Sequence, residues 1–275
     1  MTTPQHLTAG APLTARSGRV KEARKLSRRP VRAERRLFLA DGPKAVEGAL
    51  AATLGSGAGC VVEVFASAAA DFPALRGAAA AAGAAWTTVD DHAMASLSDS
   101  VTPAGVVAIC RFLDRDPAEV VRGADLVVVC ADVRDPGNAG TVIRTADAVA
   151  ADGVLLAGHS VDPYNPKTVR ASVGSLFHLP HGLEPDPAAA VTTARDAGLV
   201  VLAADGEGEV DLFDADDLAR GPVAWLLGNE AWGLPPEIAG LADHRVRIPI
   251  PGRAESLNLA SAAAVCLYAT ARARR

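Results

Sequence analysis

Aromatic residues are scarce in this 275-residue chain: six Phe, three Trp and two Tyr make up 4% of it. RNA-reading modules that stack bases on a sheet need several exposed aromatic side chains, so this composition argues against such a module. Hydrophobic residues at 49% and charged residues at 21% are typical of a globular protein, and they exclude a disordered polyelectrolyte or a fibrous repeat. The length allows two domains or one large α/β domain.

Cysteine is also scarce, and its spacing excludes two classes of site. The four residues Cys60, Cys110, Cys130 and Cys266 lie far apart, so neither a Cys-x-x-Cys metal pair nor a secreted disulfide framework is visible. We predict buried free thiols in a reducing compartment. The first residues contain no apolar signal segment, and no apolar run approaches the ~20 residues of a membrane span. These absences predict a soluble, cytoplasmic protein that does not enter a membrane.

The formal net charge of the chain is −5, but one segment is strongly basic. Residues 16–36 hold ten Lys and Arg against two Glu, a net charge of +8, which leaves −13 on the rest of the chain. This contrast indicates a local nucleic-acid contact, because the remainder alone would repel a polyanion. A helix with a solvated basic face explains the same charges as well. The candidate RNA-binding residues in this segment are Arg24, Lys25, Arg28 and Arg29.

Turn residues and apolar runs divide the chain into four segments. Residues 1–18 are predicted to be disordered, 19–113 to form a small α/β domain, 114–124 a linker, and 125–275 a second α/β domain. Expected strands cover 36–39, 60–66, 87–89, 106–112, 126–131, 153–157, 176–179, 199–203, 223–227 and 245–250. Expected helices cover 43–53, 71–82, a stretch ending at 150, 166–172, 187–197 and 256–271. Strands that alternate with helices in the second domain predict a mostly parallel sheet covered on both faces.

The first of three unusual segments, DVRDPGNAGTVIR at 132–144, follows a fully apolar run. Its Asp-Pro pair predicts a helix start. The two glycines after that pair leave backbone room at a strand end, where ligands of open α/β sheets bind, although the glycines alone also fit an ordinary turn. We expect the helix to bring the Asn138 amide and the Arg144 guanidinium near one another at this sheet edge.

The second segment, WLLGNEAWGLPPE at 225–237, continues an apolar strand into a tight turn. The turn exposes the amide of Asn229 and the carboxylate of Glu230. Alone, an Asn-Glu pair is usually a solvated turn; here it follows a strand of the same predicted sheet.

The third segment, IPIPGRAESLN at 248–258, contains two prolines that cannot donate to a β-ladder. Its backbone groups are therefore free to meet a ligand. Either Ser256 or Asn258 can cap the helix that follows. That helix is apolar around almost its whole circumference from 257 to 269, so it needs a second surface from this fold or from another subunit.

In this order and spacing, the three segments resemble the signature motifs of the SpoU (TrmH) family of RNA ribose 2′-O-methyltransferases, within the SPOUT superfamily. The motifs read N-x-G-x-x-x-R, L-G-N-E-x-x-G-L and I-P-I-x-G-x-x-x-S-L-N. The resemblance covers roughly residues 125–272, and RASVGSLFHLP at 170–180 is similar to a further family segment. FLADGPKAVEGAL at 38–50 resembles part of the family's N-terminal substrate-binding domain, which has a ribosomal-protein-like α/β fold.

The resemblance implies a trefoil-knotted domain in which residues 228–258 pass through a loop and S-adenosylmethionine (AdoMet) binds in the knot. It also implies a homodimer formed through the knot region, and it requires no metal. By motif position, the residues implied to hold the adenosyl group are Gly228, Ile248, Ile250 and Leu257, with Leu202 and Ala203 nearby.

The catalytic residues that the resemblance implies are Arg144, Asn138, Glu230, Ser256 and Asn258. Arg144 corresponds to the family's catalytic arginine, and we interpret it as a clamp for the RNA phosphate and the 2′-hydroxyl. Asn138 and Asn258 would orient this clamp. Glu230 would fix Arg144 or the ribose, and Ser256 would contact cofactor or substrate.

The sequence therefore predicts an AdoMet-dependent RNA 2′-O-methyltransferase. A separate recognition domain favours ribosomal RNA as the substrate, with transfer RNA as an alternative. A non-catalytic RNA-binding or ribosome-assembly factor is the alternative from another class, and the intact polar motif residues argue against it.

Overall fold

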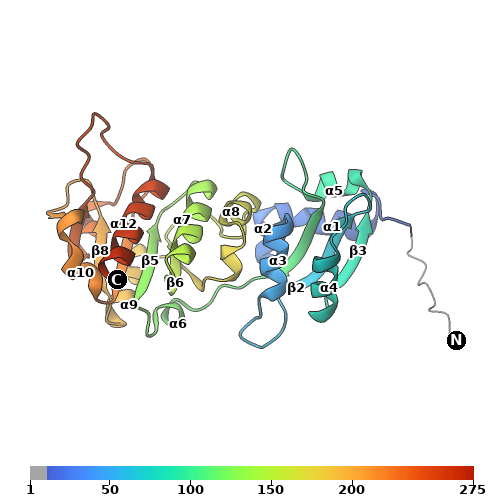
Figure 1. The fold of residues 1–275 in the computed structure, drawn as a ribbon, viewed down its shortest axis with the longest axis horizontal. Helices are drawn as coiled ribbons and strands as arrows, with labels where there is room; N and C mark the ends of the chain where they lie inside the picture. The colour runs from blue at the N-terminus through green and yellow to red at the C-terminus, as the bar shows by residue number, and fades with distance from the viewer. Residues whose placement is uncertain (1–10) are drawn as a thin grey trace.

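The computed structural model describes residues 11–275, which form two α/β units side by side along the long axis of the molecule (Figure 1). The first ten residues of the segment predicted to be disordered lie outside the described residues. From residue 11 onward that prediction is wrong. The backbone N–H of Leu13 donates to Thr88 at 2.9 Å and its carbonyl accepts from Asp90 at 2.9 Å, so this segment pairs beside the first sheet.

The first unit is a four-stranded sheet in the order β1-β4-β2-β3, in which only β2 and β3 are parallel. Its strands are β1 (Leu37–Asp41), β2 (Val61–Ser67), β3 (Ala85–Val89) and β4 (Val106–Arg111). Helices α3 (Pro43–Ala51) and α4 (Pro73–Ala81) cover one face of the sheet, and α1 (Gly18–Arg24) and α5 (Asp91–Leu97) cover the other. A 3₁₀ turn (Lys25–Ser27) and α2 (Arg29–Arg35) lead from α1 into β1.

The second unit is a seven-stranded sheet in the order β7-β6-β5-β10-β8-β11-β9, with every adjacent pair parallel. Its strands are β5 (Leu126–Ala131), β6 (Gly153–Ala157), β7 (His181–Glu184), β8 (Val200–Ala204), β9 (Val210–Asp211), β10 (Val223–Leu227) and β11 (His244–Arg247). Its helices are α6 (Pro117–Val121), α7 (Pro136–Ala148), α8 (Pro166–Ser172), α9 (Pro187–Asp196), α10 (Asp216–Arg220), α11 (Pro236–Ala239) and α12 (Leu259–Ala273). The predicted parallel sheet is confirmed.

Both faces of this second sheet are buried, which explains why its central strands are apolar throughout. Along β5, Val128 and Cys130 face the core under α7 and α12, whereas Val127 and Val129 face the core under α6 and α9. The alternation follows from the period of two in a β-strand.

The register of the central strands positions the later loops. Strand β10 lies between β5 and β8, with Leu227 opposite Cys130 and Leu226 opposite Ala203. The three parallel strands therefore end at one edge of the sheet, and the loops after them emerge together there.

Two predicted elements are wrong. The apolar run at 176–179 is a 3₁₀ turn (Ser175–Phe177) whose side chains pack into the core, and the strand lies later, at β7. The predicted linker 114–124 contains helix α6, whose Val120 and Val121 are buried in the second unit. The first error arises because a short apolar run is compatible with a strand, a turn or a helix. The second arises because an Asp-Pro pair marks a helix start as well as a loop: Asp116 caps α6 and Pro117 is its first residue.

The terminal helix α12 also departs from the prediction of burial nearly all round. One face is buried through Ala263, Cys266 and Leu267, while Val265 and Tyr268 are 37% and 56% exposed on the other face. Within the single chain the helix therefore has an uncovered apolar side.

The four cysteines are buried free thiols, as predicted. Burial raises the pKa of the Cys130 and Cys266 thiols to about 12, so both are protonated at neutral pH. No helix formed by residues 11–275 is long and apolar enough to cross a membrane.

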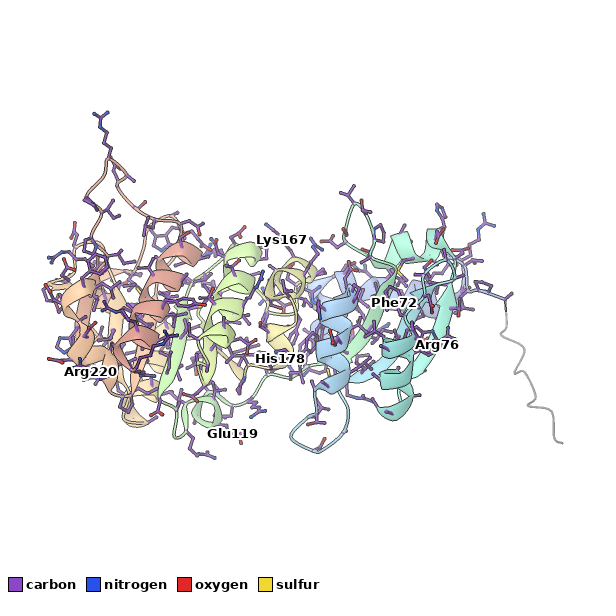
Figure 2. All side chains as sticks on the ribbon, in the orientation of Figure 1. Phe72, Arg76, Glu119, Lys167, His178 and Arg220 are labelled. Carbon is purple, nitrogen blue, oxygen red and sulfur yellow. The ribbon has the colours of Figure 1, made fainter. Side chains whose placement is uncertain are left out.

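The two units meet over a buried ion pair. The Arg32 side chain of α2 is 2% exposed, and its guanidinium donates to Asp162 Oδ2 at 2.6 and 3.0 Å and to the carbonyls of Leu26 and Ser27. Figure 2 shows Lys167 on the side of the second unit that adjoins the first unit.

Beside this ion pair lies an aromatic cluster that contains Tyr164 and Phe112, whose rings stack with centroids 3.8 Å apart. The Tyr164 hydroxyl donates to Asp114 Oδ1 at 2.7 Å and accepts the backbone N–H groups of Leu113 and Asp114 at 2.7 Å. The hydrogen bonds and the stacked rings join the chain between the units to the second unit.

Replacing Arg32 with Ala should lower the free energy of unfolding by about 3–5 kcal/mol, because it leaves the Asp162 carboxylate buried without its partner. Arg35→Ala is the matched control, since Arg35 pairs with Glu22 at 2.7 Å on the surface and its loss should change the free energy of unfolding far less. Urea unfolding of both variants measures the difference. Equal losses would contradict a structural role for the buried pair.

Candidate functional site

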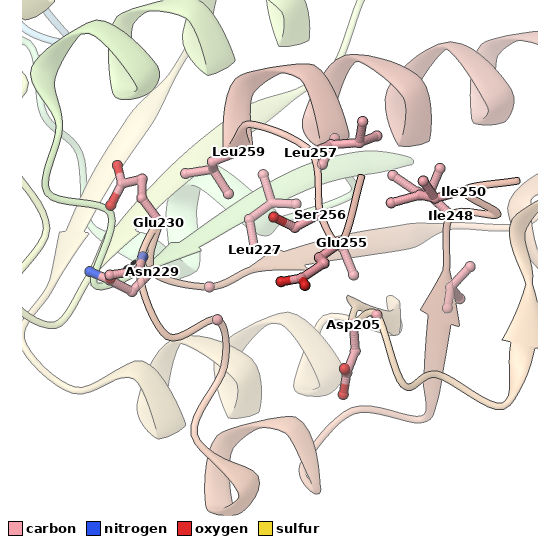
Figure 3. Close-up of a pocket in the computed structure, with 17 residues that line it drawn as sticks. Asp205, Leu227, Asn229, Glu230, Ile248, Ile250, Glu255, Ser256, Leu257 and Leu259 are labelled. Atoms are coloured by element: carbon pink, nitrogen blue, oxygen red, sulfur yellow. Dashed lines mark hydrogen bonds between the residues drawn. The ribbon is translucent and has the colours of Figure 1, made fainter. Parts of the chain in front are cut away.

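A cavity of about 260 Å³ opens at the carboxyl edge of the second sheet. Figure 3 shows Glu230 at one end of it, Asp205 and Ile248 at the other, and Ser256 between them. The predicted site residues that line this cavity are Gly228, Glu230, Ile248, Ile250, Ser256 and Leu257. The second and third motif segments are thus brought together as predicted.

Next to the cavity, a chain of hydrogen bonds joins all three motif segments. Asn138 Nδ2 donates to Glu230 Oε1 at 3.2 Å, and Asn258 Nδ2 donates to Asn138 Oδ1 at 3.1 Å. Asn258 Oδ1 also caps α12 by accepting the N–H groups of Ala260 and Ser261. Of the two predicted caps, Asn258 is therefore the one that the structure uses.

The carboxylate of Glu230 is held by the loop that starts α7. It accepts the backbone N–H groups of Asp135 at 2.9 Å and Arg134 at 3.1 Å. Burial acts to raise the pKa of the Glu230 carboxyl, but these N–H donors outweigh it and leave the pKa below its ordinary value. Glu230 is therefore a fixed anion at neutral pH.

Asp135 is the predicted helix start, and the prediction is confirmed. Its side chain accepts the Asn138 backbone N–H at 2.8 Å and caps α7. This backbone N–H and the nearby Lys167 ammonium lower the pKa of the Asp135 carboxyl. Because the cap fixes the first turn of α7, it also fixes the Asn138 side chain that reaches Glu230.

Arg144 does not join this chain of hydrogen bonds. Its side chain is exposed on α7, and the guanidinium makes no hydrogen bond or ion pair with any of residues 11–275. Six positions separate it from Asn138, which places the two side chains well apart around the helix. The expectation that the helix brings this amide and guanidinium together is wrong, and so is the expected contact of Glu230 with Arg144 within one chain.

Leu202 and Ala203 do not line the cavity. Both are fully buried inside β8, because that strand is covered on both faces, and the cavity begins with the residues that follow them, Ala204 and Asp205. Gly228 does line the cavity, but its lack of a side chain serves the fold: an added Cβ would lie 2.4 Å from the Gly233 backbone.

Sequence reasoning missed two carboxylates at the cavity, Asp205 and Glu255. Asp205 directly follows a strand whose end meets the site edge, and this position was the signal that could have found it. Glu255 lies inside the third motif, one residue before Ser256. Asp205 is paired with Arg245 at 3.6 Å, whereas Glu255 has no hydrogen-bond or ion-pair partner in residues 11–275.

The backbone of the third motif is unpaired, as its prolines predict. Among the described residues, 249–257 make no backbone–backbone hydrogen bond. This stretch forms the wall of the cavity at Ile250, Ser256 and Leu257. It offers peptide donors and acceptors that the fold does not use.

The basic segment of the first unit is partly neutralised. Its ion pairs are Arg19 with Glu63, Lys25 and Arg35 with Glu22, Arg32 with Asp162, and Arg36 with Asp114. Of the four candidate RNA-binding residues, Arg24, Arg28 and Arg29 are exposed and have no ion-pair partner within residues 11–275. Lys25 is exposed too, but Glu22 lies 2.5 Å away.

Comparison with known proteins decides the family. Residues 125–268 match the SpoU rRNA Methylase family, and residues 18–108 match an MRM3-like substrate binding domain. The chain belongs to the SpoU rRNA methylase family. The resemblance drawn from the three motifs is confirmed, and so is the resemblance of the first unit to a substrate-binding domain.

Among the relatives whose names state a substrate are two that are similar over most of their own length and of this chain. A Bacillus subtilis 23S rRNA (guanosine(2553)-2′-O)-methyltransferase is 30% identical over 93% of this chain and 96% of its own length. A Streptomyces viridochromogenes 23S rRNA (uridine(2479)-2′-O)-methyltransferase is 42% identical, over 62% of this chain and 61% of that relative.

Two solved structures extend the likeness across both units. An AdoMet-bound rRNA methyltransferase from Sinorhizobium meliloti superposes with a TM-score of 0.82 at 34% identity, covering 93% of this chain and 95% of the other. The SpoU methyltransferase AviRb from Streptomyces viridochromogenes, in complex with AdoMet, gives a TM-score of 0.82 at 30% identity, covering 94% and 98%.

Asn138→Asp should destabilise the protein more than Asn138→Ala, because a carboxylate would replace the amide donor 3.2 Å from the Glu230 carboxylate. We expect Asn138→Asp to lower the free energy of unfolding by about 1–3 kcal/mol. Thr141→Asp, an exposed position of the same helix, controls for the added charge. Thermal unfolding measures all three, and an Asn138→Asp variant as stable as Thr141→Asp would show that the Asn138–Glu230 contact is not formed.

Proposed function

We propose that this protein transfers the methyl group of AdoMet to a ribose 2′-hydroxyl of ribosomal RNA. The main support is that the three family motifs lie together at one edge of the sheet. There Glu230, Asn138 and Asn258 form a hydrogen-bonded chain beside a cavity. The two named relatives support ribosomal RNA as the substrate, and their names give two different target nucleosides, a guanosine and a uridine.

The cavity fits AdoMet in its chemistry. Leu227, Ile248 and Leu257 offer an apolar surface to the adenine, and the unpaired backbone of 249–257 offers peptide donors and acceptors. Asp205 and Glu255 offer negative charge to a ligand that carries a positive sulfonium and an ammonium group. We propose Gly228, Ile250 and Ser256 as further contacts.

AdoMet, when bound, supplies a methyl group already activated by the positive sulfur. The protein must hold the ribose hydroxyl in line with that methyl and allow its proton to leave. Glu230 is unsuited to accept the proton, because its oxygens are occupied by N–H donors and its pKa is lowered. We assign it the role of holding the first and second motifs together.

Arg144 is a residue of the first motif that is free to contact RNA. Its guanidinium is exposed, and a planar fork of donors suits a phosphate and a neighbouring hydroxyl. The Asn138 side chain ties the first turn of α7 to Glu230, and Asn258 caps α12 and donates to Asn138. The two amides therefore position the helix that carries Arg144 and do not contact Arg144 itself.

We propose that residues 19–113 recognise the RNA and that residues 125–275 perform the transfer. The exposed arginines Arg24, Arg28 and Arg29 support an RNA contact of the first unit, with Lys25 contributing less because of its Glu22 partner. The cytoplasmic location remains a prediction, and the four free thiols support it.

The homodimer is also a proposal. The uncovered face of α12, with Val265 and Tyr268 exposed, supports a second copy packing there. The trefoil knot remains a prediction for residues 228–258. Insertion of β10 between β5 and β8 is compatible with it.

Incubation of the purified protein with methyl-labelled AdoMet and either ribosomal or transfer RNA tests the function. We expect label in ribosomal RNA, recovered after nuclease digestion as a 2′-O-methylnucleoside. Label in transfer RNA alone would favour the alternative substrate, and absence of label from both RNAs would favour the non-catalytic binding factor.

Arg144→Ala should abolish methyl transfer while the AdoMet affinity measured by calorimetry stays unchanged, because Arg144 lies outside the cavity. Arg144→Lys should fail as well, since a single ammonium cannot reproduce the guanidinium fork. Substantial methyl transfer by either variant would contradict the proposed role of Arg144 in positioning the RNA.

Sedimentation should give a mass of about 56 kDa, twice the 28.1 kDa of one chain, as expected for a closed two-fold dimer. Tyr268→Arg should shift the mass toward that of one chain, because it places a charge on the exposed face of α12. The exposed Phe213 provides a control as Phe213→Arg, which should remain a dimer. A wild-type monomer at micromolar concentration would contradict the proposed interface.

A further inference from the structure

A second cleft, of about 560 Å³, lies between the two units and shares no lining residue with the cavity. Arg29 and Arg32 of α2 line it from the first unit. Arg134, from the loop after β5, and His159 and Asp162, from the loop after β6, line it from the second.

The floor of this cleft is rigid. Arg32 is buried, and its two bonds to Asp162 and two to backbone carbonyls use four of the five N–H donors of its guanidinium. The charges of Arg32 and Asp162 cancel, so this pair fixes the spacing of the walls but adds no net charge.

The walls of the cleft are positive. Arg29 and Arg134 are both exposed, and neither has a carboxylate partner among residues 11–275. The Arg134 guanidinium lies 5.3 Å from the centre of the Trp232 ring, which restrains the side chain without neutralising it. The rest of the chain outside the basic segment is net negative, so this local excess of positive charge is unusual.

The cleft is also adjacent to the site. The backbone N–H of Arg134 donates to Glu230, which belongs to the hydrogen-bonded chain of the three motifs. At its other end, Arg29 directly follows the exposed Arg28 along the chain. A polyanion that contacts Arg28 and Arg29 and enters the cleft would therefore arrive beside Glu230.

We propose that this cleft binds the phosphodiester backbone of the RNA substrate, with Arg29 and Arg134 contacting phosphates from opposite units. This inference rests on the proposed function and extends it, because it adds a residue of the catalytic unit to the RNA-binding surface. Binding across both walls would align the RNA relative to the site. Recognition here is of phosphate charge, so it does not depend on base sequence.

The test measures RNA affinity at several salt concentrations for Arg29→Gln, Arg134→Gln and the double variant, with one single-stranded RNA oligonucleotide of fixed sequence as the probe. Each lost phosphate contact should flatten the log–log slope by about 0.7 on single-stranded RNA, and the double variant by about 1.4. Arg134→Lys should keep the wild-type slope, because it keeps the charge. Arg122→Gln, an exposed arginine after α6, is the control and should leave the slope unchanged.

AdoMet affinity and unfolding temperature should stay at wild-type values in every variant, because both side chains are exposed and lie outside the cavity. If the wild-type protein methylates RNA and Arg134→Gln keeps the wild-type salt dependence of RNA affinity, the proposal that the cleft binds RNA is wrong. The proposed methyltransferase function would then still hold. If the variants flatten the salt dependence of RNA affinity but the wild-type protein methylates no RNA, the result would support RNA binding by the cleft and contradict the proposed methyltransferase function.

Discussion

The position of β10 between β5 and β8 is the constraint on which the functional site depends. The register of these parallel strands sets Leu227 beside Cys130, so the loops that follow β5, β8 and β10 leave the sheet at one edge. Because both faces of the sheet are buried, a slip of one residue would exchange the side chains that face the two cores. Core packing therefore fixes where the motif loops meet, and the same register places the cavity and its polar neighbours.

Polar contacts between the motif loops then hold these loops together at the edge of the sheet. Glu230, Asn138 and Asn258 come from segments 92 and 120 residues apart in sequence, and each satisfies the hydrogen-bonding groups of another. The same three side chains hold the first turns of α7 and α12. Polar residues of the motifs thus stabilise the local fold, while Arg144 stays exposed for a partner. This separation explains how the site can be ordered before RNA arrives.

Much of the second unit could be predicted, because its buried strands are continuous apolar runs; β5, β6 and β10 begin and end where the sequence indicates. The helix cap at Asp135 could also be predicted, because a side chain that accepts a hydrogen bond, followed directly by Pro, is a local signal of a helix start. Two of the missed features concern non-local geometry, because no local pattern tells that Arg32 is buried against Asp162 or that the run 176–179 is a turn. The separation of Arg144 from Asn138 was predictable from the helix itself, because six residues along an α-helix do not bring two side chains to the same face. The motif letters name the residues of the site, but the contacts between them depend on how distant loops pack.

Mapping of 2′-O-methyl groups in ribosomal RNA from a strain that lacks this protein tests whether the chain methylates ribosomal RNA in the cell. We expect one ribosomal 2′-O-methyl group to be lost from that strain, to return when the wild-type chain is supplied, and to stay absent when the chain carries Arg144→Ala. An unchanged set of ribosomal 2′-O-methyl groups in the deletion strain, or full restoration by the Arg144→Ala chain, would contradict this expectation.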